Sequence, residues 1–269
     1  MIPKLFARLS QKTTFKRFAW KRIYNYLASK YQNVDFWTFM NYGYSDAYMA
    51  EKVILETEEE PERYPAQLYH QVAQVIDTTG VKVLEVGSGR GGGASYVMRA
   101  LKPREMVGLD IADKAINFSN KRHKIPGLSF VQGSAEDLPF SDNHFDLVIN
   151  VESSHTYGSE QAFYREVKRV LKPGGVFSIA DIRIESRVEE FKNNLRQSGM
   201  KILEENDISK NVIEAIELGE ERKAAGIRRI MGDRKAKLFK QWAGMKNGLI
   251  HTELMNSKRS YLHYVLQKE

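Results

Sequence analysis

The sequence predicts an α/β fold, in which a mostly parallel sheet of seven strands carries helices on both faces. Short apolar segments rich in β-branched residues alternate with amphipathic segments from residue 65 to residue 207, and this alternation is typical of parallel strands joined by helical crossovers. A glycine cluster at 87–93 follows the first apolar segment and precedes a helix-forming one. Such a strand, tight turn and helix place backbone N–H groups where a ligand can bind.

The individual elements follow from the spacing of apolar residues, which is short and continuous in buried strands and three to four residues in helices. The predicted strands are 81–86, 105–111, 128–133, 145–151, 176–181, 201–206 and 261–267. The main predicted helices are 65–76, 94–101, 113–123, 159–171 and 208–245, and a Lys-Pro-Gly-Gly turn is predicted at 172–175.

The chain is predicted to have four parts. Residues 1–64 form a basic and aromatic helical arm that covers the ligand, and residues 65–207 form the ligand-binding core. Residues 208–255 form a helical insertion that serves as a lid over the acceptor site, with a dimerisation surface as its alternative role. Residues 256–269 return as the last strand of the core sheet.

Positive charge is concentrated in the arm. Residues 1–30 hold 8 of the 41 basic residues and no acid, whereas the rest of the chain has 33 basic and 34 acidic residues. Apolar residues at helical spacing among these cations predict an amphipathic helix, which either packs on the domain or rests on a membrane surface. Because the arm contains no nucleic-acid-binding module, no nucleic-acid partner is expected.

Composition excludes several classes of protein. Cysteine is absent, so the chain forms no disulfide and offers no thiolate nucleophile. No apolar run reaches the roughly 18 residues of a membrane-spanning helix, and the N-terminus lacks the apolar core of a signal peptide. A cytoplasmic protein is therefore expected, with peripheral membrane contact through the arm and a homo-oligomer left open. The histidines lack the spacing of a metal site, and no metal is expected.

Glu85 separates two interpretations of the glycine turn. Gly87, Gly89 and Gly92 match the spacing of dinucleotide-binding turns, which favours NAD. Glu85, however, stands near the end of an apolar strand two residues before Gly87, where a carboxylate would repel a pyrophosphate and stabilise a cation. S-adenosylmethionine (SAM) carries a sulfonium and an ammonium and no phosphate, so it is the favoured cofactor.

Two further acids follow predicted strands, at the edge where parallel sheets bind their ligands. Asp110 ends the second strand, where its carboxylate can accept hydrogen bonds from both ribose hydroxyls of NAD or of SAM. Glu136 follows the third strand and can accept a hydrogen bond from the adenine amino group. The alternative for Glu136 is an acid on a surface loop.

Taken together, these motifs resemble in order and spacing the class I SAM-dependent methyltransferases, which have a Rossmann-like fold with an antiparallel last strand. The motifs are the turn at 85–91, Asp110, Ser-Ala-Glu-Asp-Leu-Pro-Phe at 134–140, Phe-Asp-Leu-Val-Ile-Asn at 145–150 and Lys-Pro-Gly-Gly at 172–175.

Within that superfamily the chain looks like the phthiotriol/phenolphthiotriol dimycocerosate methyltransferases, which O-methylate a hydroxyl of a long lipid. The shared segments are Phe-Met-Asn-Tyr-Gly-Tyr at 39–44, Gln-Leu-Tyr-His at 67–70, Gly-Gly-Gly-Ala-Ser-Tyr at 91–96, Lys-Arg-His-Lys-Ile-Pro-Gly at 121–127 and Asn-Val-Glu-Ser-Ser-His-Thr-Tyr at 150–157. Residues 205–255, which should shape the acceptor pocket, diverge from the family.

The resemblance implies a set of cofactor contacts. The glycines and Ser88 should hold the methionine part with Glu85 near its ammonium, residues 111 and 134–136 should flank the adenine, and the end of the fourth strand should face the reacting methyl group. The implied contacts are Tyr42, Glu85, Gly87, Ser88, Gly89, Gly91, Asp110, Ile111, Ser134, Ala135, Glu136, Asn150 and Val151.

The loop at 152–157 leaves the fourth strand beside the expected position of the methyl group and contains Glu152 and His155. A neutral histidine can take the proton of an acceptor hydroxyl as the methyl group arrives. His155 is therefore predicted to be the general base and Glu152 a second catalytic residue. A structural hydrogen-bonding role is the alternative for His155.

The predicted function is SAM-dependent O-methylation of a hydroxyl on a hydrophobic, lipid-like or polyketide-like small molecule, with S-adenosylhomocysteine as product. Three alternatives stay open: a C-methyltransferase of terpenoids or polyketides, a SAM-binding scaffold subunit without catalysis, and an NAD-dependent oxidoreductase.

Overall fold

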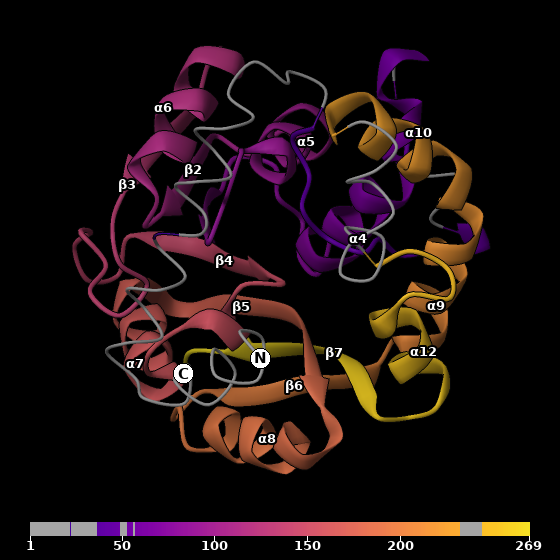
Figure 1. Ribbon diagram of the computed structural model, residues 1–269. Helices are drawn as coiled ribbons and strands as arrows, with labels where there is room; N and C mark the ends of the chain where they lie inside the picture. Colours follow the sequence, from indigo (N-terminus) through magenta and orange to yellow (C-terminus); the bar gives the residue numbers. More distant parts are fainter. Residues whose placement is uncertain (1–21, 23–36, 49–52, 56, 232–243) are drawn as a thin grey trace.

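A seven-stranded sheet with the strand order β3-β2-β1-β4-β5-β7-β6 forms the centre of the computed structural model (Figure 1). The structure describes residues 22, 37–48, 53–55, 57–231 and 244–269. Most of the predicted arm, including its basic helix, therefore lies outside the described residues.

The strands lie close to their predicted positions. They are β1 (Lys82–Val86), β2 (Glu105–Asp110), β3 (Leu128–Gln132), β4 (Phe145–Val151), β5 (Leu171–Ile184), β6 (Lys201–Asp207) and β7 (Arg259–Gln267). β1 to β5 pair in parallel, whereas β7 is antiparallel to both of its neighbours, β5 and β6. The predicted Rossmann-like sheet, mostly parallel with an antiparallel last strand, is confirmed.

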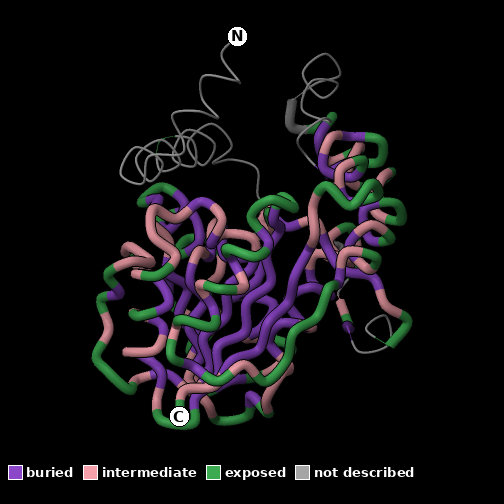
Figure 2. Tube along the Cα trace, turned by 90° about the horizontal axis from the view of Figure 1, so that it is seen from below, coloured by how far each residue is buried: buried purple, intermediate pink, exposed green. Residues whose placement is uncertain are grey.

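Helices cover both faces of the sheet. They are α4 (Arg63–Ala73), α5 (Gly92–Leu101), α6 (Asp113–Arg122), α7 (Glu160–Val170), α8 (Val188–Arg196), α9 (Ser209–Leu218), α10 (Glu220–Met231) and α12 (Leu249–Met255), with short 3₁₀ turns η1 (Thr57–Glu62), η2 (Ser154–Thr156) and η3 (Glu185–Arg187). One apolar core lies between the sheet and α4, α5, α6, α9 and α12, and a second lies between the sheet and α7 and α8. Figure 2 shows the central strands of the sheet buried between these layers.

Helix α7 illustrates how the sequence specifies an element. Ser159 precedes it, and the Ser159 hydroxyl accepts a hydrogen bond from the Ala162 N–H, which caps the first turn. Phe163, Val167 and Val170 recur at helical spacing and are fully buried against the sheet. Each such side chain contributes about 1.5–3 kcal/mol on burial, so this face fixes the helix on the second core.

The turn predicted at 172–175 lies inside β5 as a bulge. Leu171 already pairs with Phe145 of β4, and the register between the two strands shifts directly afterwards. The Gly174 N–H donates to the Lys268 carbonyl (2.7 Å), so the end of the chain holds this segment in the sheet. A pairing with residues almost a hundred positions away leaves no local signal in the sequence.

The insertion between β6 and β7 begins at the ligand-binding edge of the sheet. Because β7 is antiparallel to both neighbours, β6 runs in the same direction as β1 to β5 and ends at their carboxyl edge. Val212 and Ile216 of α9 join Tyr261 of β7 in the first core. α10 follows α9 and reaches η1, where Arg222 donates to the Glu60 carbonyl (3.0 Å). Within the described residues, no helix is both long and apolar enough to span a membrane.

His263 in β7 predicts a specific pH dependence of stability. Its ring is fully buried, with Nε2 2.9 Å from the Ser178 hydroxyl, and burial lowers the pKa of His263 from 6.5 to about 4. The unfolded chain therefore takes up this proton first as the pH falls below 6.5. The free energy of unfolding should decrease between pH 6.5 and 4, by about 3 kcal/mol in total from this residue.

Replacing His263 by glutamine tests this linkage, because the amide can still bond Ser178 but does not titrate. The comparison measures the free energy of unfolding of both proteins in urea. Between pH 7.5 and pH 5, the wild type should lose about 2 kcal/mol more of this free energy than His263→Gln. Parallel stability curves for the two proteins would contradict the assignment.

Candidate active site

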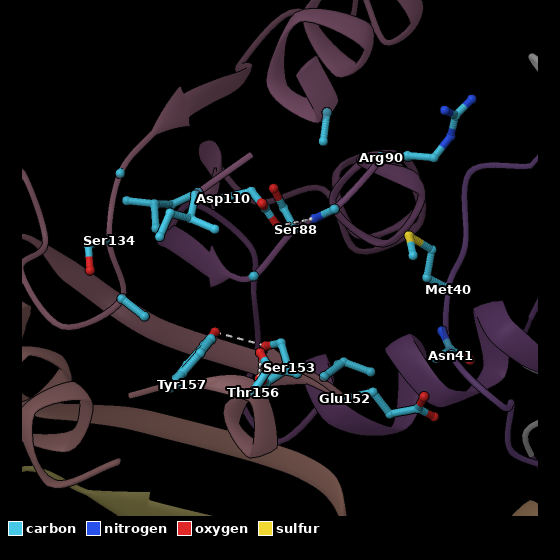
Figure 3. A pocket seen from close by; sticks show the side chains of 18 of the residues that line it. Met40, Asn41, Ser88, Arg90, Asp110, Ser134, Glu152, Ser153, Thr156 and Tyr157 are labelled. Atoms are coloured by element: carbon cyan, nitrogen blue, oxygen red, sulfur yellow. Dashed lines mark hydrogen bonds between the residues drawn. The ribbon is translucent and has the colours of Figure 1, made fainter. Parts of the chain in front are cut away.

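A cleft of about 1150 Å³, its mouth included, opens at the carboxyl ends of β1, β2 and β4. This is the edge at which open parallel sheets bind ligands. In Figure 3, Ser88 and Asp110 lie on one side of the cleft, Ser153, Thr156 and Tyr157 on another, and Met40 and Asn41 on a third.

Ten of the predicted site residues line this cleft. They are Gly87, Ser88, Gly89, Asp110, Ile111, Ser134, Ala135, Glu136, Val151 and Glu152. The other five predicted residues, Tyr42, Glu85, Gly91, Asn150 and His155, do not line it. Their positions are described below, and the cofactor and catalytic roles of all fifteen stay predictions.

The turn after β1 is held against β2. The Gly87 N–H donates to the Leu109 carbonyl (2.7 Å). Gly87 has a φ of +84°, and a Cβ there would lie 2.3 Å from the Ser153 hydroxyl oxygen, so glycine is required on both grounds. Gly91, also at positive φ, precedes α5 as its N-cap. The turn therefore presents backbone, with little side chain, to the cleft.

Asp110 anchors the glycine turn from the end of β2. Its Oδ2 accepts a hydrogen bond from the Gly89 N–H (2.9 Å), and its Oδ1 accepts one from the Ala112 N–H (2.8 Å). Burial raises the pKa of Asp110 from its ordinary value, while these N–H groups favour the ionised form. Each carboxylate oxygen keeps a second lone pair, so Asp110 can still accept hydrogen bonds from a ligand in the cleft.

Residues 37–41 lie across the glycine turn. The Arg90 Nε donates to the Trp37 carbonyl (2.6 Å), and the Arg90 guanidinium stacks 3.6 Å from the centre of the Phe118 ring. A Cβ at Gly92 would come within 2.9 Å of the Thr38 backbone, so this glycine permits the close approach. The aromatic composition of the segment was the signal for a cover, but the sequence did not show which of its residues face the cleft.

Glu85 lies behind the glycine turn and is fully buried. The Tyr69 hydroxyl donates to its Oε1 (2.6 Å), and burial raises the pKa of Glu85 to about 7 against the opposing effect of this hydrogen bond. Within the described part of the chain, Oε2 forms no hydrogen bond of its own. The sequence singled out Glu85 and contained Tyr69 in the motif at 67–70, but it did not show that Tyr69, from α4, lines the cleft and bonds Glu85.

Asn150, Ser153 and Tyr157 form a polar cluster at the bottom of the cleft. The Asn150 Nδ2 donates to the Val86 carbonyl (2.7 Å) and lies 2.7 Å from the Ser153 hydroxyl, which is 2.8 Å from the Tyr157 hydroxyl. Asn150 therefore ties the end of β4 to the end of β1, while its neighbour Val151 faces the cleft. The motif at 150–157 contained Ser153 and Tyr157, but spacing alone did not distinguish them as lining residues.

Glu136 ties the loop after β3 to the start of α7. Its Oε1 accepts hydrogen bonds from the Gly158 N–H (2.7 Å) and the Ser159 N–H (3.2 Å), immediately before that helix. A loop acid in this position is therefore built into the wall of the cleft.

Glu152 combines backbone strain with burial. It has a φ of +47°, which is rare for a residue with a side chain and is found most often at functional sites. Its Oε1 accepts hydrogen bonds from the Tyr42 N–H (2.7 Å) and the Tyr261 hydroxyl (2.8 Å). Burial raises the pKa of Glu152 to about 8. Tyr42 thus lies beyond Glu152, on the side of the insertion.

His155 is paired with a buried carboxylate. Its Nδ1 lies 2.7 Å from Asp181 Oδ1, and its backbone N–H donates to Oδ2 (3.0 Å). Asp181 is also paired with Arg183 (2.9 Å), and although burial opposes its charge, Arg183 and His155 hold the pKa of Asp181 well below its usual range. One third of the His155 side chain is exposed. Asp181 was recognised as the end of a strand but not as the partner of His155.

Within the described residues, no group of three or more His, Asp or Glu side chains could hold a metal ion. The expectation that the protein uses no metal stays a prediction.

Comparisons with known proteins agree on a family. Residues 84–179 match the family described as a methyltransferase domain. The fatty-acid O-methyltransferase of Mycolicibacterium smegmatis is 43% identical over 200 residues, which cover 74% of this chain and 72% of the relative. The phthiotriol/phenolphthiotriol dimycocerosates methyltransferase of Mycobacterium tuberculosis (strain H37Rv) is 39% identical over 212 residues. These residues cover 79% of this chain and 77% of the relative.

Solved structures support the fold. The cyclase SpnF superposes with a TM-score of 0.67 at 21% identity and covers 92% of this chain and 94% of its own. Geranyl diphosphate C-methyltransferase from Streptomyces coelicolor A3(2) superposes with a TM-score of 0.66 at 15% identity. The superposition covers 91% of this chain and 98% of that structure. Given its identity to the mycobacterial enzymes over most of their length, the chain belongs to the SAM-dependent methyltransferases, in the group of the phthiotriol/phenolphthiotriol dimycocerosate methyltransferases.

Proposed function

We propose that this methyltransferase transfers a methyl group to a hydroxyl of a hydrophobic, lipid-like or polyketide-like small molecule, with His155 as general base. The observation that supports it most is the His155–Asp181 pair (2.7 Å) next to the cleft. A carboxylate on Nδ1 fixes the imidazole in the tautomer whose Nε2 is free to take a proton.

The cleft suits SAM as a cofactor. Its lining combines the backbone of the glycine turn with carboxyl groups and aromatic side chains. Asp110 offers an anchored carboxylate for ribose hydroxyls, and Glu85 has an oxygen without a hydrogen bond behind the turn, which suits a nearby cation. In this proposal, Ile111 and 134–136 hold the adenine, and the glycine turn holds the methionine part. Bound SAM would supply a methyl group already activated by the sulfonium.

The chain's own residues then contribute alignment and proton removal. Alignment of the acceptor oxygen with the methyl group can lower the barrier by about 7–11 kcal/mol. As the new oxygen–carbon bond forms, the hydroxyl proton moves to Nε2 of His155, and the charge on the ring is stabilised by Asp181. General base catalysis of this kind contributes about 10²–10⁴-fold.

A second candidate acceptor is a fatty-acid carboxylate, which is favoured by the 43% identity to a fatty-acid O-methyltransferase. A carboxylate oxygen is already a nucleophile and carries no proton at neutral pH, so this reaction needs no general base. The two acceptors therefore make different demands on His155.

Product analysis tests the proposal. We expect the purified protein, supplied with SAM, a long-chain alcohol and the matching long-chain acid, to form the methyl ether of the alcohol, identified by mass spectrometry and NMR. A methyl ester alone would replace the hydroxyl by the carboxylate as acceptor. A product methylated on carbon, or none with any acceptor, would contradict the proposal.

A further inference from the structure

Lys223 of α10 lies on the insertion side of Glu152. Its Nζ is 5.5 Å from the centre of the Tyr42 ring, and the Tyr42 backbone N–H donates to Glu152 Oε1 (2.7 Å). Within the described part of the chain, no hydrogen bond or ion pair of Lys223 is found, although the charges of Glu152, Glu62 and Glu220 act on it. The mechanism above does not use this lysine.

The Tyr42 ring is held by the insertion from two sides. Lys223 lies over the ring, and a Cβ at Gly244 would come within 2.1 Å of it. Gly244 and Lys223 both belong to the insertion, whereas Glu152 lines the cofactor cleft. A continuous path of contacts therefore leads from the insertion, through Tyr42, to a carboxylate in the cleft.

We propose that Lys223 is a positioning residue that acts through Glu152, and that the insertion uses it to favour the ionised form of this carboxyl group where the acceptor enters the cleft. The inference rests on the proposed function, because the acceptor is expected under the insertion. It assigns the acceptor side of the cleft to Glu152, opposite the cofactor side marked by Asp110.

The charges around Lys223 and Glu152 decide in which direction Lys223 changes the pKa of Glu152. The Tyr42 N–H and the Tyr261 hydroxyl contact Glu152, and Tyr69 of α4, Asp181 of β5 and Lys223 of α10 act on its charge. Among them Lys223 is the cation, and it lowers the pKa of Glu152, which burial and Asp181 raise.

Lys223 is itself perturbed by the same cluster. Burial lowers its pKa, whereas Glu152, Glu62 and Glu220 raise it. Burial raises the pKa of Glu62 to about 7, although the charge of Lys223 lowers it. Removing the positive charge should therefore leave Glu152 protonated to higher pH.

The first test measures Glu152 directly. In protein with ¹³C-labelled glutamate side chains, NMR titration should show the Glu152 carboxyl, identified by its loss in Glu152→Gln, titrating about one pH unit higher in Lys223→Met than in the wild type. Lys223→Arg should restore the wild-type value, and Lys210→Met, at an exposed position of α9, should leave it unchanged. Lys223→Gln serves as the neutral variant should the methionine protein not fold.

The second test uses the reaction. With a hydroxyl acceptor, Lys223→Met should move the acid limb of kcat/KM to higher pH and lower kcat/KM at pH 7 about tenfold, with the affinity for S-adenosylhomocysteine unchanged. A Glu152 titration unaffected by Lys223→Met would overturn the proposal. The titration requires no acceptor, so it remains decisive even if no methyl transfer to a hydroxyl occurs.

Discussion

Asp110→Ala is expected to weaken the binding of S-adenosylhomocysteine at least about 100-fold. Hydrogen bonds to a charged group contribute about 1.5–3 kcal/mol each, and two ribose hydroxyls would lose this acceptor. The variant also removes the acceptor that holds the Gly89 and Ala112 N–H groups, so the glycine turn itself should loosen. Calorimetric titration measures the affinity directly.

Two controls separate the contributions to this loss. Asp110→Asn keeps one acceptor oxygen and should give an intermediate affinity. Asp113→Ala removes an exposed acid at the start of α6 and should leave the affinity unchanged. The same titration with NAD should show no binding to the wild type. Affinity for S-adenosylhomocysteine that survives Asp110→Ala would remove Asp110 from the cofactor site.

The sequence was sufficient for the sheet and for the side of the cleft formed by the glycine turn and Asp110, because both depend on local patterns. The apolar run of β1, the glycines and the acid at the end of β2 all lie within about thirty residues, and parallel topology places strand ends at one edge. Gly87, Ser88, Gly89 and Asp110 line the cleft for that reason.

The side of the cleft at Glu152 depends on residues that are far apart in the sequence. Glu152 meets Tyr42 and Tyr261, which lie more than a hundred positions away in either direction. Each of these contacts depends on how the cover, the insertion and β7 pack together. No periodicity encodes such packing. Glu152 and Tyr42 were therefore recognised by their motifs, whereas the contact between them, Tyr261 and Lys223 were not.

His155→Ala is expected to lower turnover with a hydroxyl acceptor about 10²–10⁴-fold while the affinity for S-adenosylhomocysteine stays within about twofold. The side chain is paired with Asp181 and does not line the cofactor cleft, so its loss should remove proton transfer and leave cofactor binding intact. Stopped-time assays with the methyl ether as readout give kcat, and calorimetry gives the affinity. His144→Ala, in a turn beside Lys82, is the matched control and should retain full turnover.

The choice of acceptor makes this variant more informative than a replacement of Asp181. Asp181 and Glu160 both pair with the buried Arg183, so a replacement of Asp181 would also remove part of the neutralisation of this buried charge and confuse folding with catalysis. If His155 is the general base, His155→Ala should lose activity toward an alcohol and retain it toward a carboxylate, because only the alcohol must give up a proton. Equal losses with both acceptors would give His155 a role in positioning, and full activity toward the alcohol would exclude it as the base.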